Sequence, residues 1–224
     1  MKLYYAPASS YSQRVLIALY EKNAIFKSIE VDLFNPEVRA RYIQSNPFAK
    51  IPALETEDGK VIFEACIIIE YLDLYCRREP RLLPKDQYLA LEVRKLERII
   101  DLYINGGRQV LFDDTQRPVA ARGGKEVVKA RRLVETACVL LNERLQHHTW
   151  LAGDEFSLAD CTAAPTLTYL RMVYSYKHLP RLMNYVQRLE SRPSVALVQR
   201  DGYEQMMRML AMLPHPLGLV ALNS

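Results

Sequence analysis

The sequence predicts an α+β protein built from two parts, a small mixed sheet with helices and then an all-helical region. Short strand-like runs alternate with helical runs up to residue 76, and no strand-like run follows later in the chain. Between the two parts, residues 77–86 read RREPRLLPKD, with two prolines and several charges, as is typical of a linker. We therefore expect domains at residues 1–78 and 87–224, joined by a linker at 79–86.

The first part begins with a strand, a helix, a second strand and a short helix. Residues 2–5 form the first strand-like run, and residues 11–22 carry apolar side chains at helical spacing. Residues 28–31 predict the second strand. Pro36, in the first helical position after Asn35, starts a short helix that reaches about Tyr42.

A hairpin and a third helix complete this part. Strand-like runs at residues 53–57 and 61–63 flank a turn at Asp58-Gly59, and a helix over residues 64–75 follows. The order is βαβ, helix, ββα, with one parallel crossover and one antiparallel hairpin. That order is the thioredoxin-like arrangement.

Two backbone surfaces on the hairpin unit favour a small peptide that carries a carboxylate. Pro52 cannot donate to a sheet, so it belongs at the first residue of a strand or in a tight turn that accommodates a cis bond. Ile51 before it is expected to be extended, with its N–H and C=O free to pair with another chain. The helix from Glu64 directs bare N–H groups and the positive end of its dipole at an anion.

The second part carries helical patterns throughout. They cover residues 88–110, 125–146, 158–174, 181–189 and 194–213, with a loop at residues 112–124. Ser157 and Asp160 have the spacing of a capping box, which predicts that this pair starts a helix and has no catalytic role. Losing such a cap costs about 1 kcal/mol.

Composition narrows the function classes. A formal net charge of +4 over 224 residues is too small to indicate nucleic-acid binding from charge alone. The four cysteines form no C-x-x-C pair and no signal peptide is recognisable, so we expect reduced thiols in a cytoplasmic protein. No run has the roughly 18 apolar residues of a spanning helix. We also expect no metal site, because His147 and His148 are typical of solvent-facing residues at a helix end.

Three motifs, in this order, resemble the cytosolic glutathione S-transferase superfamily. They are I-P-A-L at residues 51–54, F-E-A at 63–65 and L-A-G-D-E-F-S-L-A-D at 151–160. The resemblance covers nearly the whole chain. It implies a homodimer that uses glutathione as co-substrate, without a metal. Glutathione would lie along the N-terminal domain, and an electrophilic, largely hydrophobic substrate would lie between the domains, in a role such as detoxification.

The resemblance also implies which residues bind glutathione. Ile51 would pair its backbone with the cysteinyl part, Pro52 is similar to the family's cis proline, and Glu64 resembles the acidic residue near the γ-glutamyl amine. The next position is usually a serine whose hydroxyl and N–H hold the γ-glutamyl carboxylate. Here Ala65 keeps only the N–H, and the missing hydrogen bond is worth about 1.5–3 kcal/mol. Two further contacts are implied, Tyr11 and Lys50.

The catalytic candidates follow the first strand. Residues 9–15, S-S-Y-S-Q-R-V, resemble the serine-type classes theta, delta and zeta, in which the serine matched by Ser9 stabilises the glutathione thiolate. Ser10 is the second candidate. A thiol with a pKa near 8.5 is mostly protonated at neutral pH, so a hydroxyl donor beside a helix N-terminus favours the thiolate. The alternative is that Ser9 or Ser10 only caps the helix.

The second substrate is expected to meet residues late in the first helix of the helical part or just past it. They are Tyr103, which could stack on a flat substrate, Arg108, which could steer an acidic one, and Phe112. The alternative places Tyr103 in the core and Arg108 in solvent.

A non-catalytic protein on the same fold is the alternative function. Y-S-Q-R-V at residues 11–15 and D-E-F-S-L-A-D-C at 154–161 also resemble the stringent starvation protein A family. That resemblance implies RNA polymerase as a protein partner, with no direct nucleic-acid contact and no membrane. Ala65 is the residue that keeps this alternative open.

Overall fold

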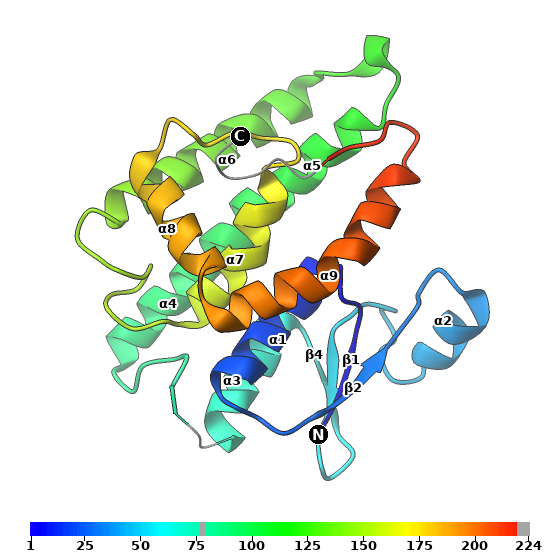
Figure 1. Ribbon diagram of the computed structural model, residues 1–224, viewed down its shortest axis with the longest axis vertical. Helices are drawn as coiled ribbons and strands as arrows, with labels where there is room; N and C mark the ends of the chain where they lie inside the picture. Colours follow the sequence, from blue (N-terminus) through cyan, green and yellow to red (C-terminus); the bar gives the residue numbers. More distant parts are fainter. Residues whose placement is uncertain (77–78, 219–224) are drawn as a thin grey trace.

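The computed structural model describes residues 1–76 and 79–218, in which a small sheet with three helices packs against a larger helical region (Figure 1). One apolar core runs through both parts, from Leu3 in the sheet to Leu167 in the helical region. The predicted α+β class, with a thioredoxin-like first part and an all-helical second part, is confirmed. Residues 77–78, between the two parts, lie outside the described residues, and the predicted domain bounds stay predictions.

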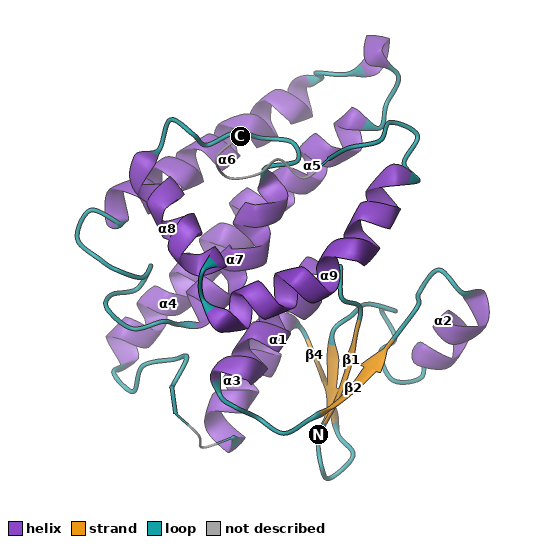
Figure 2. Ribbon diagram, in the orientation of Figure 1, coloured by secondary structure: helices purple, strands orange, loops and turns teal. Residues whose placement is uncertain are grey.

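The sheet has the predicted topology (Figure 2). Its strand order is β2-β1-β3-β4, and the strands are β1 (Lys2–Tyr5), β2 (Lys27–Glu30), β3 (Ala53–Glu55) and β4 (Val61–Phe63). β1 runs parallel to β2, and β3 is antiparallel to both β1 and β4. β3 ends before the predicted residue 57 because Thr56 turns the chain. The Thr56 N–H donates to the Lys60 carbonyl at 2.8 Å, and the Thr56 hydroxyl accepts from the Lys60 N–H at 3.0 Å.

Helices cover both faces of the sheet. Helices α1 (Ser10–Glu21) and α3 (Ala65–Tyr75) bury their apolar residues with Leu3 and Leu54, while α2 (Pro36–Tyr42) packs on the opposite face. There Tyr42 joins Ala53, the neighbour of Leu54 in β3, in a separate apolar cluster. This division follows from the alternation of side chains along a strand.

The helical part begins with one long interrupted helix. This helix consists of α4 (Gln87–Ile99), the π-helix η1 (Ile100–Asn105) and α5 (Gly106–Thr115). The rest of the helical part consists of the 3₁₀ helix η2 (Val119–Ala121), α6 (Lys125–Arg144), α7 (Leu158–Leu170), α8 (Pro180–Glu190) and α9 (Pro193–Ala211). The loop predicted from residue 112 is wrong at its start, because α5 continues to Thr115 with Leu111 buried against the core. Gly107 brings α5 close to α6, since a Cβ there would lie 2.4 Å from Val134 Cγ2.

The predicted capping box starts α7 and is structural. Asp160 is fully buried, and its carboxylate accepts bonds from the N–H of Leu151 at 3.1 Å and the N–H of Ser157 at 2.9 Å. The hydroxyls of Ser157 and Tyr185 also donate to it, at 2.8 and 2.6 Å. The Asp160 side chain therefore has its acceptors occupied by the protein, which confirms the cap.

No helix among residues 1–76 and 79–218 is long and apolar enough to cross a membrane. Within the same ranges, no group of three or more His, Cys, Asp or Glu side chains is arranged to hold a metal ion.

Candidate active site

The N-terminus of α1 carries the two serine candidates. Ser9 is the N-cap, and its Oγ accepts from the Ser12 N–H at 3.2 Å. Ser10 is the first helical residue and is buried. Ser9 therefore caps the helix, as the alternative predicts, but capping occupies only an acceptor lone pair of its hydroxyl. A serine hydroxyl that accepts one bond keeps its proton to donate to another group, so capping and thiolate stabilisation are compatible.

The helical part holds the loop in front of Ser9. The Ala8 N–H donates to Gln205 Oε1 of α9 at 2.8 Å, and the Tyr169 hydroxyl of α7 donates to the Ala8 carbonyl at 3.0 Å. Burial raises the pKa of Tyr169 to about 12, so it stays protonated as this donor. A Cβ on Gly202 of α9 would lie 2.5 Å from the Pro7 carbonyl oxygen, so only glycine permits this close approach.

The segment before β3 has the backbone conformation that the sequence predicts. The Ile51-Pro52 bond is cis, as expected. The Lys50 carbonyl accepts from the Tyr42 hydroxyl at 2.8 Å and from Asn46 Nδ2 at 2.7 Å, which fixes the chain just before Ile51. Within the described chain the Ile51 N–H and C=O have no hydrogen-bond partner, so both remain available to a ligand. The Lys50 side chain is exposed.

The N-terminus of α3 has no side-chain cap from its N-cap residue. Glu64 is its N-cap with φ 73°, a left-handed conformation that costs a non-glycine residue energy. The first N–H groups of a helix have no intrahelical acceptor, and the exposed Glu64 side chain makes no capping bond to those of α3. Ala65, the first helical residue, is buried and offers only its N–H.

A cavity of about 620 Å³ lies between the two parts of the molecule. Its walls come from the α1 N-terminus, the loop after β2, α5, and the C-terminal ends of α7 and α9. The lining residues are Ala8, Ser10, Asp32, Phe34, Arg108, Gln109, Phe112, Tyr169, Met172, Met206, Met209, Leu210, Met212 and Leu213. Of the predicted site residues, it brings together Ser10, Arg108 and Phe112. Tyr103 lies elsewhere, on η1 with 43 % of its surface exposed.

Arg108 is buried, with 9 % exposure. Its Nε and Nη2 donate to Asn105 Oδ1 at 3.1 and 3.0 Å. Burial lowers the pKa of Arg108, because the charge is removed from water. The alternative that places Arg108 in solvent is therefore wrong, while its role in steering an acidic substrate stays a prediction.

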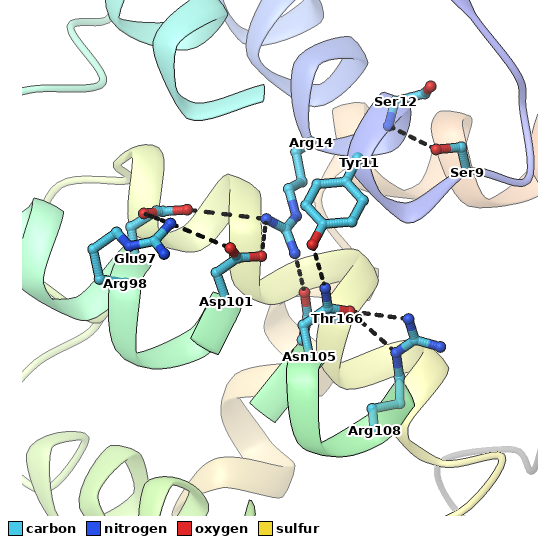
Figure 3. A network of polar contacts seen from close by, with 10 residues as sticks. All are labelled: Ser9, Tyr11, Ser12, Arg14, Glu97, Arg98, Asp101, Asn105, Arg108 and Thr166. Carbon is cyan, nitrogen blue, oxygen red and sulfur yellow. Dashed lines mark hydrogen bonds and ion pairs between the residues drawn. The ribbon is translucent and has the colours of Figure 1, made fainter. Parts of the chain in front are cut away.

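Asn105 also connects this arginine to α1 (Figure 3). Its Nδ2 donates to the Tyr11 hydroxyl at 2.9 Å, while its Oδ1 accepts from Arg108. Burial raises the pKa of Tyr11 and keeps the phenol neutral. The Tyr11 hydroxyl therefore accepts a bond from within the protein, although the residue is 38 % exposed.

Arg14 fixes α1 to the π-helix next to this link (Figure 3). Its Nη1 lies 2.8 Å from Asp101 Oδ1, and its Nη2 donates to Thr166 of α7 at 3.2 Å. The Arg14 guanidinium also stacks 4.2 Å from the centre of the Tyr11 ring. The more distant Glu97 carboxylate, 3.9 Å from Nη1, has a pKa raised mainly by burial.

Sequence reasoning missed Arg14, Asp101 and Asn105, although the sequence contains one signal for Arg14 and one for Asn105. Arg14 interrupts the apolar face of a predicted helix, where a charge requires a partner. Asn105 precedes two glycines inside a helical pattern, and such a stretch favours a local irregularity. The π-helix at 100–105 is that irregularity, and π-helical turns are frequent at functional sites.

Comparisons with known proteins show which family this chain resembles. Residues 8–74 match the family model for the glutathione S-transferase N-terminal domain, and residues 99–193 match the model for the C-terminal domain. Glutathione S-transferase F6 of Arabidopsis thaliana is 30 % identical over 205 residues, which cover 88 % of this chain and 98 % of that protein. The uncharacterized GST-like protein YibF of Escherichia coli is 31 % identical, covering 88 % and 96 %.

Solved structures show the same fold. A glutathione S-transferase from Methylobacillus flagellatus, determined with glutathione bound, is 27 % identical with a TM-score of 0.78, covering 88 % of this chain and 98 % of that one. A glutathione S-transferase from Methylobacterium radiotolerans, in complex with glutathione sulfonate, is 29 % identical with a TM-score of 0.76, covering 88 % and 93 %.

Proposed function

Because this chain belongs to the cytosolic glutathione S-transferase superfamily, we propose that it transfers the glutathione thiolate to a small electrophile. The electrophile has a largely apolar body and occupies the cavity between the two domains, residues 1–78 and 87–224. The observation that carries the proposal is the position of Ser10. It lies at the N-terminus of α1 and also lines this cavity, so a thiolate held at that helix end faces the second substrate.

The glutathione backbone has a matching set of groups. The free N–H and C=O of Ile51 pair with the cysteinyl residue, and Lys50 lies beside it. The open N-terminus of α3 receives the γ-glutamyl carboxylate through the Ala65 N–H, with the exposed Glu64 carboxylate near the amine. The relatives solved with glutathione and glutathione sulfonate support this ligand.

Ser9 stabilises the thiolate, and Ser10 is the second candidate. The Ser9 hydroxyl proton is not used by the cap, and its position in front of α1 adds the helix dipole to its own hydrogen bond. Ser10 lines the cavity, which Ser9 does not, but Ser10 is buried in the first turn of α1. Tyr11, held by Asn105 and Arg14, contributes its ring as a wall beside the thiol.

The protein acts as a cytoplasmic homodimer. An exposed apolar surface lies over α3 and α4, where Arg94 makes two bonds of 2.8 Å to Glu70 and joins the helices. Ile67 and Leu74 lie one turn either side of Glu70, and Leu91 lies one turn before Arg94, all at least half exposed. Sedimentation of the wild type and of Ile67→Glu at matched concentrations measures this dimer. A wild type that sediments as a monomer contradicts it.

The first test is a glutathione titration, followed by a conjugation assay with a generic aryl halide. Binding tighter than millimolar, with activity lost in Ser9→Ala or in Ser10→Ala, supports the transferase and identifies which serine acts. Binding that is undetectable at high millimolar glutathione refutes it.

Ala65 favours a second candidate, an interaction protein without catalysis that binds RNA polymerase. The missing hydroxyl weakens the carboxylate site by about ten- to hundredfold if nothing replaces it. Under this candidate, RNA polymerase is retained on the immobilised protein and glutathione does not bind.

A further inference from the structure

The guanidinium of Arg108 presents one unoccupied edge to the cavity. Asn105 takes one N–H from Nε and one from Nη2, which is one edge of the fork. In the described chain Nη1 has no hydrogen-bond partner, and Arg108 has no carboxylate within 4.0 Å. Figure 3 shows Nη1 directed away from Asn105. The free Nη1–Nη2 edge can bind a carboxylate with two parallel hydrogen bonds.

The buried positive charge of Arg108 would be stabilised by a bound anion. Removing an ion from water is costly unless a partner offsets the loss, and no described residue supplies one to Arg108. The side chain is 9 % exposed and lines the cavity, so the partner has to come from there.

The remainder of the lining defines the body of the ligand. Phe112, Met172, Met206 and Leu210 give the cavity an apolar wall, and methionines adapt to varied shapes. Among the described residues of the lining, Asp32 is the other one with a charged side chain, and it disfavours a second negative group. The cavity therefore suits a molecule with one anionic end and an apolar body.

We infer that the electrophilic substrate is an amphipathic monoacid whose carboxylate is bound by Arg108, with Asn105 as the residue that positions Arg108. This inference rests on the proposed transferase function and names its substrate class. Asn105 is held in one orientation because its Oδ1 accepts from Arg108 while its Nδ2 donates to Tyr11. The acid-binding arginine and the thiol-binding end of α1 are thus set by the same side chain.

A matched pair of acceptors tests the substrate class. Para-chloro-meta-nitrobenzoate and the corresponding benzamide differ only in the charge of one group. In both, the glutathione sulfur forms a bond to the ring carbon that carries chlorine, and chloride leaves with the electron pair. For each variant we compare the ratio of kcat/KM for the acid to kcat/KM for the amide. The intrinsic reactivities of the two acceptors are the same in every variant, so they cancel when this ratio is compared between variants.

The acid-to-amide ratio should fall about ten- to hundredfold in Arg108→Gln, since a charged hydrogen bond is lost. Arg132→Gln removes the same charge from an exposed position on α6 and should leave the ratio unchanged. Asn105→Ala should lower the ratio through a raised KM for the acid, and Arg108→Lys should restore part of it. A ratio that stays the same in Arg108→Gln overturns the inference. An unchanged ratio with equal losses for both acceptors shows that Arg108 acts on a step common to both reactions.

Binding separates this inference from the transferase itself. Meta-nitrobenzoate lacks the leaving group, so its binding is measured by calorimetry without any reaction. If neither acceptor reacts but this acid binds and Arg108→Gln weakens it, the proposed function fails while the acid site stands. If the acid binds equally to wild type and Arg108→Gln, or to neither, the acid site is refuted. Near-identical circular dichroism spectra of the variants exclude misfolding as the cause.

Discussion

Restoring the serine hydroxyl with Ala65→Ser should strengthen glutathione binding. Position 65 is the first residue of α3, after an N-cap whose side chain makes no bond to the helix. The bare N–H groups there form an anion site without a side-chain donor. A serine adds one O–H donor at the point where the γ-glutamyl carboxylate is proposed to lie.

The size of the gain follows from the hydrogen bond added. A bond to a charged group is worth about 1.5–3 kcal/mol, which corresponds to about ten- to hundredfold in Kd. Ala65 is 4 % exposed, so accommodating the extra oxygen reduces the gain toward the lower end of this range. The stability of the protein should change by less than about 1 kcal/mol, because only one atom is added at a helix end.

Calorimetric titration with glutathione measures the change, and the adjacent Cys66→Ser is the control. Cys66 lies one position along α3, about 100° around the helix, so its new hydroxyl should not reach the carboxylate. A tenfold tighter Kd in Ala65→Ser with no gain in Cys66→Ser supports the site. If Ala65→Ser folds normally and its Kd is unchanged, the γ-glutamyl carboxylate does not lie at this helix end.

Four further variants test the scaffold. Gly202→Ala should destabilise the protein by about 1–3 kcal/mol and lower activity, since its Cβ meets the Pro7 carbonyl. Gly106→Ala, whose Cβ would lie 3.8 Å from the Asp101 carbonyl oxygen, should stabilise by about 0.5–1 kcal/mol. Equal effects of the two glycine variants in denaturant melts would refute the contrast. Asp160→Ala should cost about 3 kcal/mol or more in the same melts, because it leaves buried donors unpaired, and a loss below 1 kcal/mol would argue against the cap. Burial raises the pKa of Glu97, so on acidification the native state takes up this proton at a higher pH than the unfolded state does. The wild type should therefore gain stability relative to Glu97→Gln as the pH falls toward about 4.3. A stability difference that does not change with pH contradicts the raised pKa.

The sheet and most helices could be predicted because their signals are local. The strand at residues 2–5 and the helix from Pro36 to Tyr42 have the observed bounds, since alternation and an N1 proline act over a few residues. The end of β3 was overestimated because Thr56 bonds to Lys60 across the turn, and no period of two reveals that contact.

The site was predictable only where it depends on backbone geometry. Ile51, Pro52 and the N-terminus of α3 follow from a proline and a helix start, which the sequence displays directly. The pairing of Asn105 with both Tyr11 and Arg108 depends on the packing of α1 against a π-helix, which no local pattern encodes. The place of Tyr103 along a helix predicts that it meets the second substrate, whereas Tyr103 is 43 % exposed on the π-helix and is not among the described residues that line the cavity.

The thiol pKa of bound glutathione tests the central claim most directly. Thiolate absorbance is followed against pH with saturating glutathione, in the wild type and in Ser9→Ala. The wild-type thiol should titrate at least one pH unit below the value near 8.5 of an unperturbed cysteine thiol, and Ser9→Ala should move it back toward that value. A bound thiol that titrates like free glutathione in the wild type, or no saturable binding, would contradict the proposed role of this helix end.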